Sequence, residues 1–100
     1  MNKNSVIPFL LFCSTLSFGQ SSLARLSCYI NQLSHLDVSE NTAMTNLNCD
    51  DNQLSHLDVS KNTALIKLEC GDNHLNHLDV SKNTALKDDI IVDKNVKIYR

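Results

Sequence analysis

The sequence predicts a small, mainly β repeat solenoid, and three observations lead to this fold class. The segment Leu-Ser-Cys-Tyr-Ile-Asn-Gln-Leu-Ser-His-Leu-Asp-Val-Ser, which begins at Leu26, is closely copied from Leu47 and again from Leu68. These starting points are 21 residues apart. Apolar and polar residues alternate in each copy, which is typical of a strand with one buried face. A fixed period of this length indicates a stack of coils, one for each copy.

The chain begins with the features of a secretory signal peptide, which we predict at residues 1–19. Lys3 precedes the apolar run 6–13, and Ser17-Phe18-Gly19 forms a small-x-small cleavage motif. We expect cleavage at Gly19 or Gln20 and expect the signal peptide to lie outside the folded domain. The alternative is a retained N-terminal anchor, although a membrane-spanning helix needs about 20 apolar residues and this run is shorter.

Residues 20–85 are predicted to hold three repeats, at 23–43, 44–64 and 65–85. Each follows the pattern L-x-x-L-x-C-x-x-N-x-L-x-x-L-x-V, with methionine once in place of the first leucine. Successive strands should pair in parallel, about 4.8 Å apart. Twenty-one residues leave no room for a long helix, so short extended and 3₁₀ segments are expected on the other side. Residues 86–100 break the pattern and are predicted to form a degenerate, charged capping coil.

The second repeat carries a family resemblance in Leu47-x-Cys49-x-x-Asn52-x-Leu54-x-x-Leu57-Asp58-Val59-Ser60-x-Asn62-Thr63-Ala64. This pattern resembles the leucine-rich repeats of secreted bacterial proteins, above all the 21-residue, cysteine-containing subclass of internalin-J-like surface proteins. The resemblance implies a right-handed, curved solenoid with a parallel β-sheet on its concave face. It also implies that this face binds a protein or glycan on a host or neighbouring cell. Family members usually carry many more repeats, followed by a sorting or anchoring domain.

Two columns of repeated residues are predicted to be structural. The asparagines should bridge neighbouring coils, because a carboxamide both donates and accepts hydrogen bonds. The cysteines should pack as small hydrophobic residues. Once Cys13 is removed with the signal peptide, three cysteines remain, and three cannot all form disulfides within one molecule. Cysteines that lie in one line along the stack also do not supply the tetrahedral arrangement of a zinc site. The two columns are Cys28, Cys49 and Cys70, and Asn31, Asn52 and Asn73.

The candidate partner-binding face consists of positions that differ between the copies on the predicted strands. Because the repeated residues hold each coil together, recognition should depend on the variable ones. Tyr29 is the best candidate for an anchor, since aromatic side chains dominate the energy of many interfaces. The face is predicted to comprise Arg25, Ser27, Tyr29, Asn46, Asn48, Asp50, Lys67 and Glu69.

Composition and spacing speak against several other functions. The chain has 9 Lys and Arg against 11 Asp and Glu, a net charge of −2, and without Lys3 the net charge is −3. Nucleic acid is therefore a poor partner. Serine, histidine and aspartate recur in columns and do not converge on one point, so we expect no enzyme activity and no cofactor. The histidine column His35, His56 and His77 is interpreted as solvent-facing and not as a metal site.

We therefore expect a secreted or cell-surface binding module that has no membrane span after signal cleavage. The alternative is a truncated or degenerate repeat fragment with only a structural role. Only residues 20–22 would precede the first repeat after cleavage, and these three cannot cover Leu23 and Leu26. Because repeat stacks need caps at both ends, we expect end-to-end self-association through the first repeat, or marginal stability.

Overall fold

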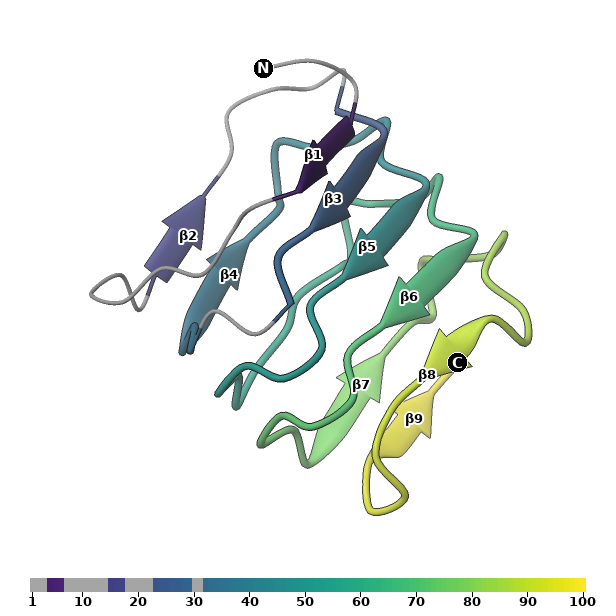
Figure 1. Ribbon diagram of the computed structural model, residues 1–100. Helices are drawn as coiled ribbons and strands as arrows, with labels where there is room; N and C mark the ends of the chain where they lie inside the picture. The colour runs from purple at the N-terminus through teal and green to yellow at the C-terminus, as the bar shows by residue number, and fades with distance from the viewer. Residues whose placement is uncertain (1–3, 7–14, 18–22, 30–31) are drawn as a thin grey trace.

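The computed structural model describes residues 4–6, 15–17, 23–29 and 32–100, and within them the fold is all β (Figure 1). No helix occurs in this part of the chain, and its short strands form three parallel sheets. It accordingly contains no helix that is long and apolar enough to cross a membrane.

The largest sheet has five strands in the order β1-β3-β5-β6-β8. Leu26 pairs with Leu47, and Leu47 pairs with Leu68, so equivalent residues of successive repeats lie side by side. The 21-residue spacing of the sequence is thus the spacing from strand to strand. The strands are β1 (Asn4–Val6), β3 (Arg25–Ser27), β5 (Asn46–Asn48), β6 (Lys67–Glu69) and β8 (Ile90–Ile91).

The opposite side carries two smaller sheets, each of two parallel strands (Figure 1). β2 (Thr15–Ser17) pairs with β4 (His35–Asp37), and β7 (His77–Asp79) pairs with β9 (Lys97–Tyr99). Residues 56–58 of the second repeat form no strand, although 54–59 have the same sequence as 33–38. The regular layering expected on this side is therefore interrupted in the middle repeat.

The core lies between the sheets and is built from the repeated apolar columns. Leu57 departs from its column, because it is only partly buried where residues 56–58 form no strand, whereas the equivalent Leu36 and Leu78 are buried. Leu54, in the same repeat, is fully buried. The buried columns are Leu26, Leu47 and Leu68; Cys28, Cys49 and Cys70; Leu33, Leu54 and Leu75; and Val38, Val59 and Val80.

The connections beyond each valine are pairs of tight turns, which corrects the expectation of 3₁₀ segments. The N–H of Asn41 bonds to the carbonyl of Val38 at 3.0 Å, and the N–H of Met44 bonds to the carbonyl of Asn41 at 3.1 Å. A 3₁₀ helix needs such bonds at consecutive residues. Here they are three residues apart, and the described residues contain no 3₁₀ helix.

Two strands come from the segment that the sequence assigns to a signal peptide. Asn4 pairs with Arg25 along β1 and β3, and Thr15 pairs with His35 along β2 and β4. In the uncleaved chain these backbones therefore lie along the first repeat, although the sequence predicted that the segment lies outside the fold. Removal of the signal peptide stays a prediction.

At the other end, residues 86–100 supply the last strand of each side. Leu68 pairs with Ile90, and Leu78 pairs with Ile98. The guanidinium of Arg100 donates to the carbonyl of Lys87 at 3.1 Å, which ties the end of the chain back onto this segment. A capping role stays a prediction, but the segment does continue both layers.

Candidate binding face

The variable residues of the five-stranded sheet lie in rows on its outer face. In β3, β5 and β6 the central leucine is buried and the residues on either side of it are not. Strand register places Arg25 beside Asn46 and Asn46 beside Lys67. Ser27, Asn48 and Glu69 form the second row. Six of the eight predicted face residues are thus brought together by the sheet alone.

The remaining two, Tyr29 and Asp50, follow the strands. Tyr29 is 44% exposed, one of the most exposed large apolar side chains among the described residues. Asp50 is half-buried and accepts a hydrogen bond from the N–H of Gly71 at 2.6 Å. Tyr29 is therefore available to a partner, whereas Asp50 already serves the turn of the next repeat.

Charge is distributed unevenly across this face. Lys67 and Glu69 form an ion pair, with 3.3 Å between Nζ and Oε1. The turns that follow the strands carry several acidic residues: Asp50, Asp51, Asp72 and Asp93. Burial raises the pKa of the Asp50 carboxyl. Repulsion from Asp51 raises the pKa of Asp72, and Asp93 adds to this effect.

In the turns after β5 and β6, Asp51 and Asp72 have a left-handed backbone conformation, and each directly precedes an asparagine of the column. Their φ angles are 55° and 52°, a region that Asp and Asn tolerate better than most residues. The next residue, Asn52, is buried and its Nδ2 donates to the carbonyls of Cys28 at 3.1 Å and Cys49 at 3.0 Å. Its Oδ1 accepts from the N–H of Leu33 at 2.9 Å.

Asn73 repeats this arrangement one repeat later. Its Nδ2 donates to the carbonyls of Cys49 at 3.0 Å and Cys70 at 3.2 Å, and its Oδ1 accepts from the N–H of Leu54 at 3.1 Å. Both asparagines thus bridge neighbouring repeats. Asn31, the first member predicted for this column, lies outside the described residues.

The three cysteines are buried and free of disulfide bonds. Burial raises the pKa of the Cys28 thiol to about 12. A hydrogen bond with Cys70, together with burial, raises the pKa of Cys49. Thiols held protonated in this way are poor nucleophiles and poor metal ligands, because both roles need the thiolate.

A second asparagine column was missed by the sequence analysis, which named Asn62 only within the pattern of the second repeat. Asn62 is 0% exposed and donates to the carbonyls of Val38 at 2.9 Å and Asn41 at 3.0 Å. Asn83 likewise donates to Val59 at 2.9 Å and Asn62 at 2.8 Å. The repeated Asn-Thr-Ala at 41–43, 62–64 and 83–85 was the available signal.

The histidine side of the molecule contains a groove of about 380 Å³ between the second and third repeats, where residues 56–58 form no strand. Its lining includes His56, Leu57, Asp58, His77 and Asp79. Each aspartate already accepts a hydrogen bond from a following serine N–H, at 2.9 Å from both Ser60 and Ser81. Across the described residues, no three His, Cys, Asp or Glu side chains are grouped so as to hold a metal ion.

Comparison of the chain with protein-family models, with curated proteins and with solved structures gives no match.

Proposed function

We propose that this chain is a secreted or surface-exposed leucine-rich-repeat solenoid whose strand face binds a protein or glycan. The structure has parallel, evenly spaced strands. We propose in addition that they form a curved, right-handed stack with the five-stranded sheet on its concave side. The observation that supports it is the contrast between buried and outward-facing residues within β3, β5 and β6. Their identical leucines are buried, while the residues that differ between copies lie together in rows on one outer face.

Tyr29 supports a binding role for this face. A tyrosine that is 44% exposed, four residues after Arg25, offers a large contact area and a hydroxyl to a partner. Aromatic and arginine side chains are the residues most often found to dominate binding energy. The acidic residues beyond Glu69 favour a partner that carries positive charge on the surface facing them.

The experiment is a screen of the purified full chain against arrays of surface proteins and glycans, followed by affinity measurements on Tyr29→Ala. Truncation of an interface anchor is expected to weaken binding by about tenfold or more. Tyr99→Ala is the matched control, because Tyr99 is 46% exposed but lies in β9, on the other side of the molecule. Equal effects of the two substitutions, or no binding at all by a folded chain, would exclude the proposed face and leave the structural alternative.

A further inference from the structure

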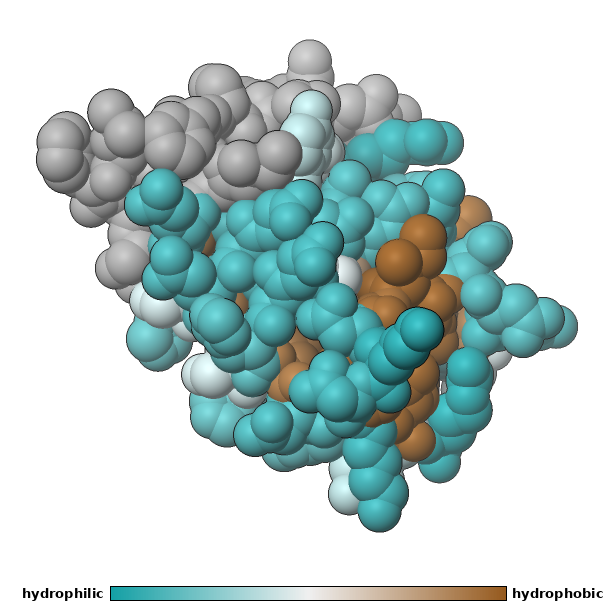
Figure 2. All heavy atoms as spheres, turned by 60° about the horizontal axis from the view of Figure 1, so that its bottom comes forward, coloured by the Kyte–Doolittle hydropathy of each residue, from teal (hydrophilic) through white to brown (hydrophobic). Residues whose placement is uncertain are grey.

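Among the described residues, each side of the molecule ends, toward the C-terminus, in a strand that is paired along one edge. β8 is the last strand of the five-stranded sheet, and β9 is the last strand on the opposite side. Ile91 and Tyr99, in these strands, are 53% and 46% exposed. Figure 2 shows hydrophobic surface on the part of the molecule away from the grey N-terminal residues. An open edge with apolar side chains is a surface to which another strand can be added.

At the N-terminal end, the described strands β1 and β2 of the predicted signal peptide cover the matching edge. β1 lies along β3, and β2 lies along β4. Without residues 1–19, β3 and β4 become the outermost strands. Their central leucines, Leu26 and Leu36, now 2% and 8% exposed, would then lie at the end of the stack.

We propose that a chain without residues 1–19 associates head to tail with a second copy of itself. β8 and β9 of one copy would lie beside β3 and β4 of the next. The register is fixed by the existing pairs, because Leu68 lies beside Ile90 and Leu78 lies beside Ile98. Continuing these columns places Ile90 beside Leu26 of the second copy and Ile98 beside Leu36 of the second copy.

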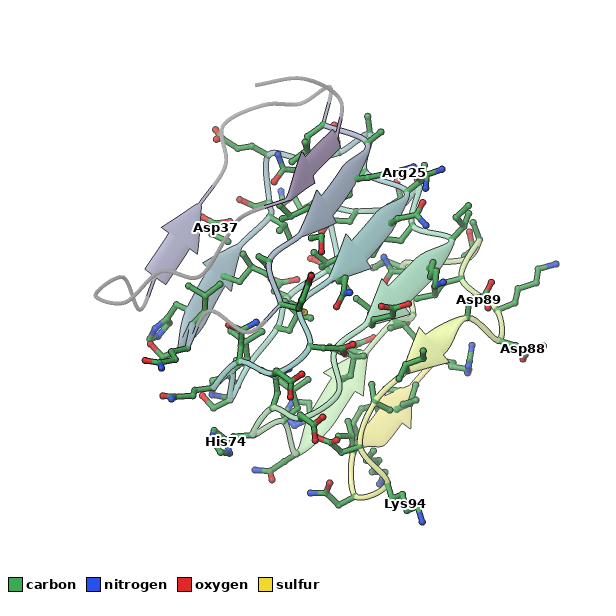
Figure 3. All side chains as sticks on the ribbon, in the orientation of Figure 1. Arg25, Asp37, His74, Asp88, Asp89 and Lys94 are labelled. Atoms are coloured by element: carbon green, nitrogen blue, oxygen red, sulfur yellow. The ribbon has the colours of Figure 1, made fainter. Side chains whose placement is uncertain are left out.

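Charge complementarity favours this occupant over an unrelated strand. The same register places Asp89 beside Arg25 of the second copy. On the other side, the register places Lys97 beside His35 and Tyr99 beside Asp37 of the second copy, so the pairing of opposite charges comes from Arg25 and Asp89. Figure 3 shows that Arg25, Asp88 and Asp89 point outward on the same side of the sheets, with the arginine toward one end and the two aspartates at the other. Opposite charges at the two ends attract in a head-to-tail arrangement and leave Arg25 facing Arg25 in a head-to-head one.

The proposed interface is heterologous, since it joins two different ends of the chain. Such contacts do not close on themselves unless the rotation between copies happens to complete a ring. The expected product is therefore a series of species that lengthens with protein concentration.

The test starts from the full chain, so that folding precedes removal of the segment. A protease recognition sequence is inserted between Gly19 and Gln20, the purified chain is cut, and the mass is followed by light scattering over a range of concentrations. The uncut chain should remain monomeric and the cut chain should form larger species, and circular dichroism should show that the strands of the repeats persist after β1 and β2 are removed.

Charge reversal then identifies the ends involved. Arg25→Glu alone, or Asp88→Lys with Asp89→Lys, should each raise the dissociation constant of the cut chain at least about tenfold, and mixing the two variants should restore association. Lys61→Glu, an exposed lysine outside both ends, is the matched control and should change nothing. A cut chain that stays monomeric overturns the proposal, as does one that unfolds on cutting. Association insensitive to Asp88 and Asp89 would also overturn it and would indicate a head-to-head contact.

Discussion

The carboxylate of Asp93 accepts hydrogen bonds from the backbone of the preceding repeat, at 2.8 Å from the N–H of Asp72. A second bond, from the N–H of Asn73, is 3.3 Å long. In the previous repeat the equivalent N–H, that of Asp51, bonds to the backbone carbonyl of Gly71 at 3.0 Å. A side chain thus replaces the main-chain acceptor at the point where the repeats end.

Asp93→Ala should therefore lower the free energy of unfolding by about 1–3 kcal/mol, because it leaves backbone N–H groups without their acceptor. Asp93→Asn is the matched control. It keeps one carbonyl oxygen for the N–H of Asp72, loses the acceptor of the longer bond from Asn73, and removes a negative charge beside Asp72, so it should destabilise the fold less than Asp93→Ala does. Denaturant unfolding measures both, and equal destabilisation by the two substitutions would contradict the role given to this carboxylate.

Asn62→Leu should be strongly destabilising. It removes the Nδ2 donor from the buried carbonyls of Val38 and Asn41, which keep only their backbone bonds, and the loss of these two buried hydrogen bonds should cost about 1–3 kcal/mol in total. Asn76→Leu is the control, because Asn76 is exposed. The two unfolding midpoints should differ clearly, and coincident midpoints would show that the second asparagine column contributes little.

Two leucines of the same repeat should respond differently to the same substitution. Leu54→Ala should cost on the order of 2–5 kcal/mol, since Leu54 is 0% exposed and its removal leaves a cavity. Leu57→Ala should cost less, because Leu57 is only partly buried beside the groove. Thermal or denaturant unfolding of both variants measures the loss of stability in each. Equal losses would indicate that the second repeat is as closely packed as its neighbours.

The stability of the fold should fall at alkaline pH because of its buried thiols. Cys28 has a pKa of about 12 in the folded chain, against an ordinary value of 9.0. Between these values the unfolded chain loses the proton and the folded chain keeps it. This contribution to stability is therefore intact below pH 9 and declines as the pH rises toward 12, by up to ~1.4 kcal/mol per pH unit.

Denaturant unfolding at a series of pH values measures this decline. Lysine and tyrosine also titrate in this range, so the comparison is with Cys28→Ala, which should show a shallower slope. Parallel slopes in the parent and the variant would mean that the Cys28 thiol does not resist ionisation in the fold.

Titration of individual carboxyls by NMR should separate two aspartates. Repulsion from Asp51 raises the pKa of Asp72, whereas a hydrogen bond from the Ser81 side chain lowers the pKa of Asp79. Asp72 should therefore titrate at the higher pH. Asp51→Asn should bring Asp72 back toward its ordinary value and leave Asp79 unchanged, and an unmoved Asp72 would exclude Asp51 as the cause.

The repeat period allowed the parallel strands, the buried leucines and the buried cysteines to be predicted, since a residue repeated every 21 positions in parallel strands must meet its own copies. Local differences were beyond this reasoning. Residues 33–38 and 54–59 have identical sequences, yet only the first contains a strand. Two segments with the same sequence cannot be told apart from their own residues, so the presence or absence of the strand must depend on the elements around them. Asp93 was missed for a related reason, because it has no counterpart in the pattern that it completes.

The direction of the asparagine bonds has a consequence for how such a chain can grow. Asn62 reaches back to the repeat before it, and Asn83 does the same one unit later. A duplicated copy of residues 44–64, placed after Ala64, would find the acceptors it needs already in position and would present the same acceptors to the unit that follows. Gene duplication can therefore lengthen the molecule without requiring new contacts between repeats. The outward-facing residues of the added repeat are then free to diverge.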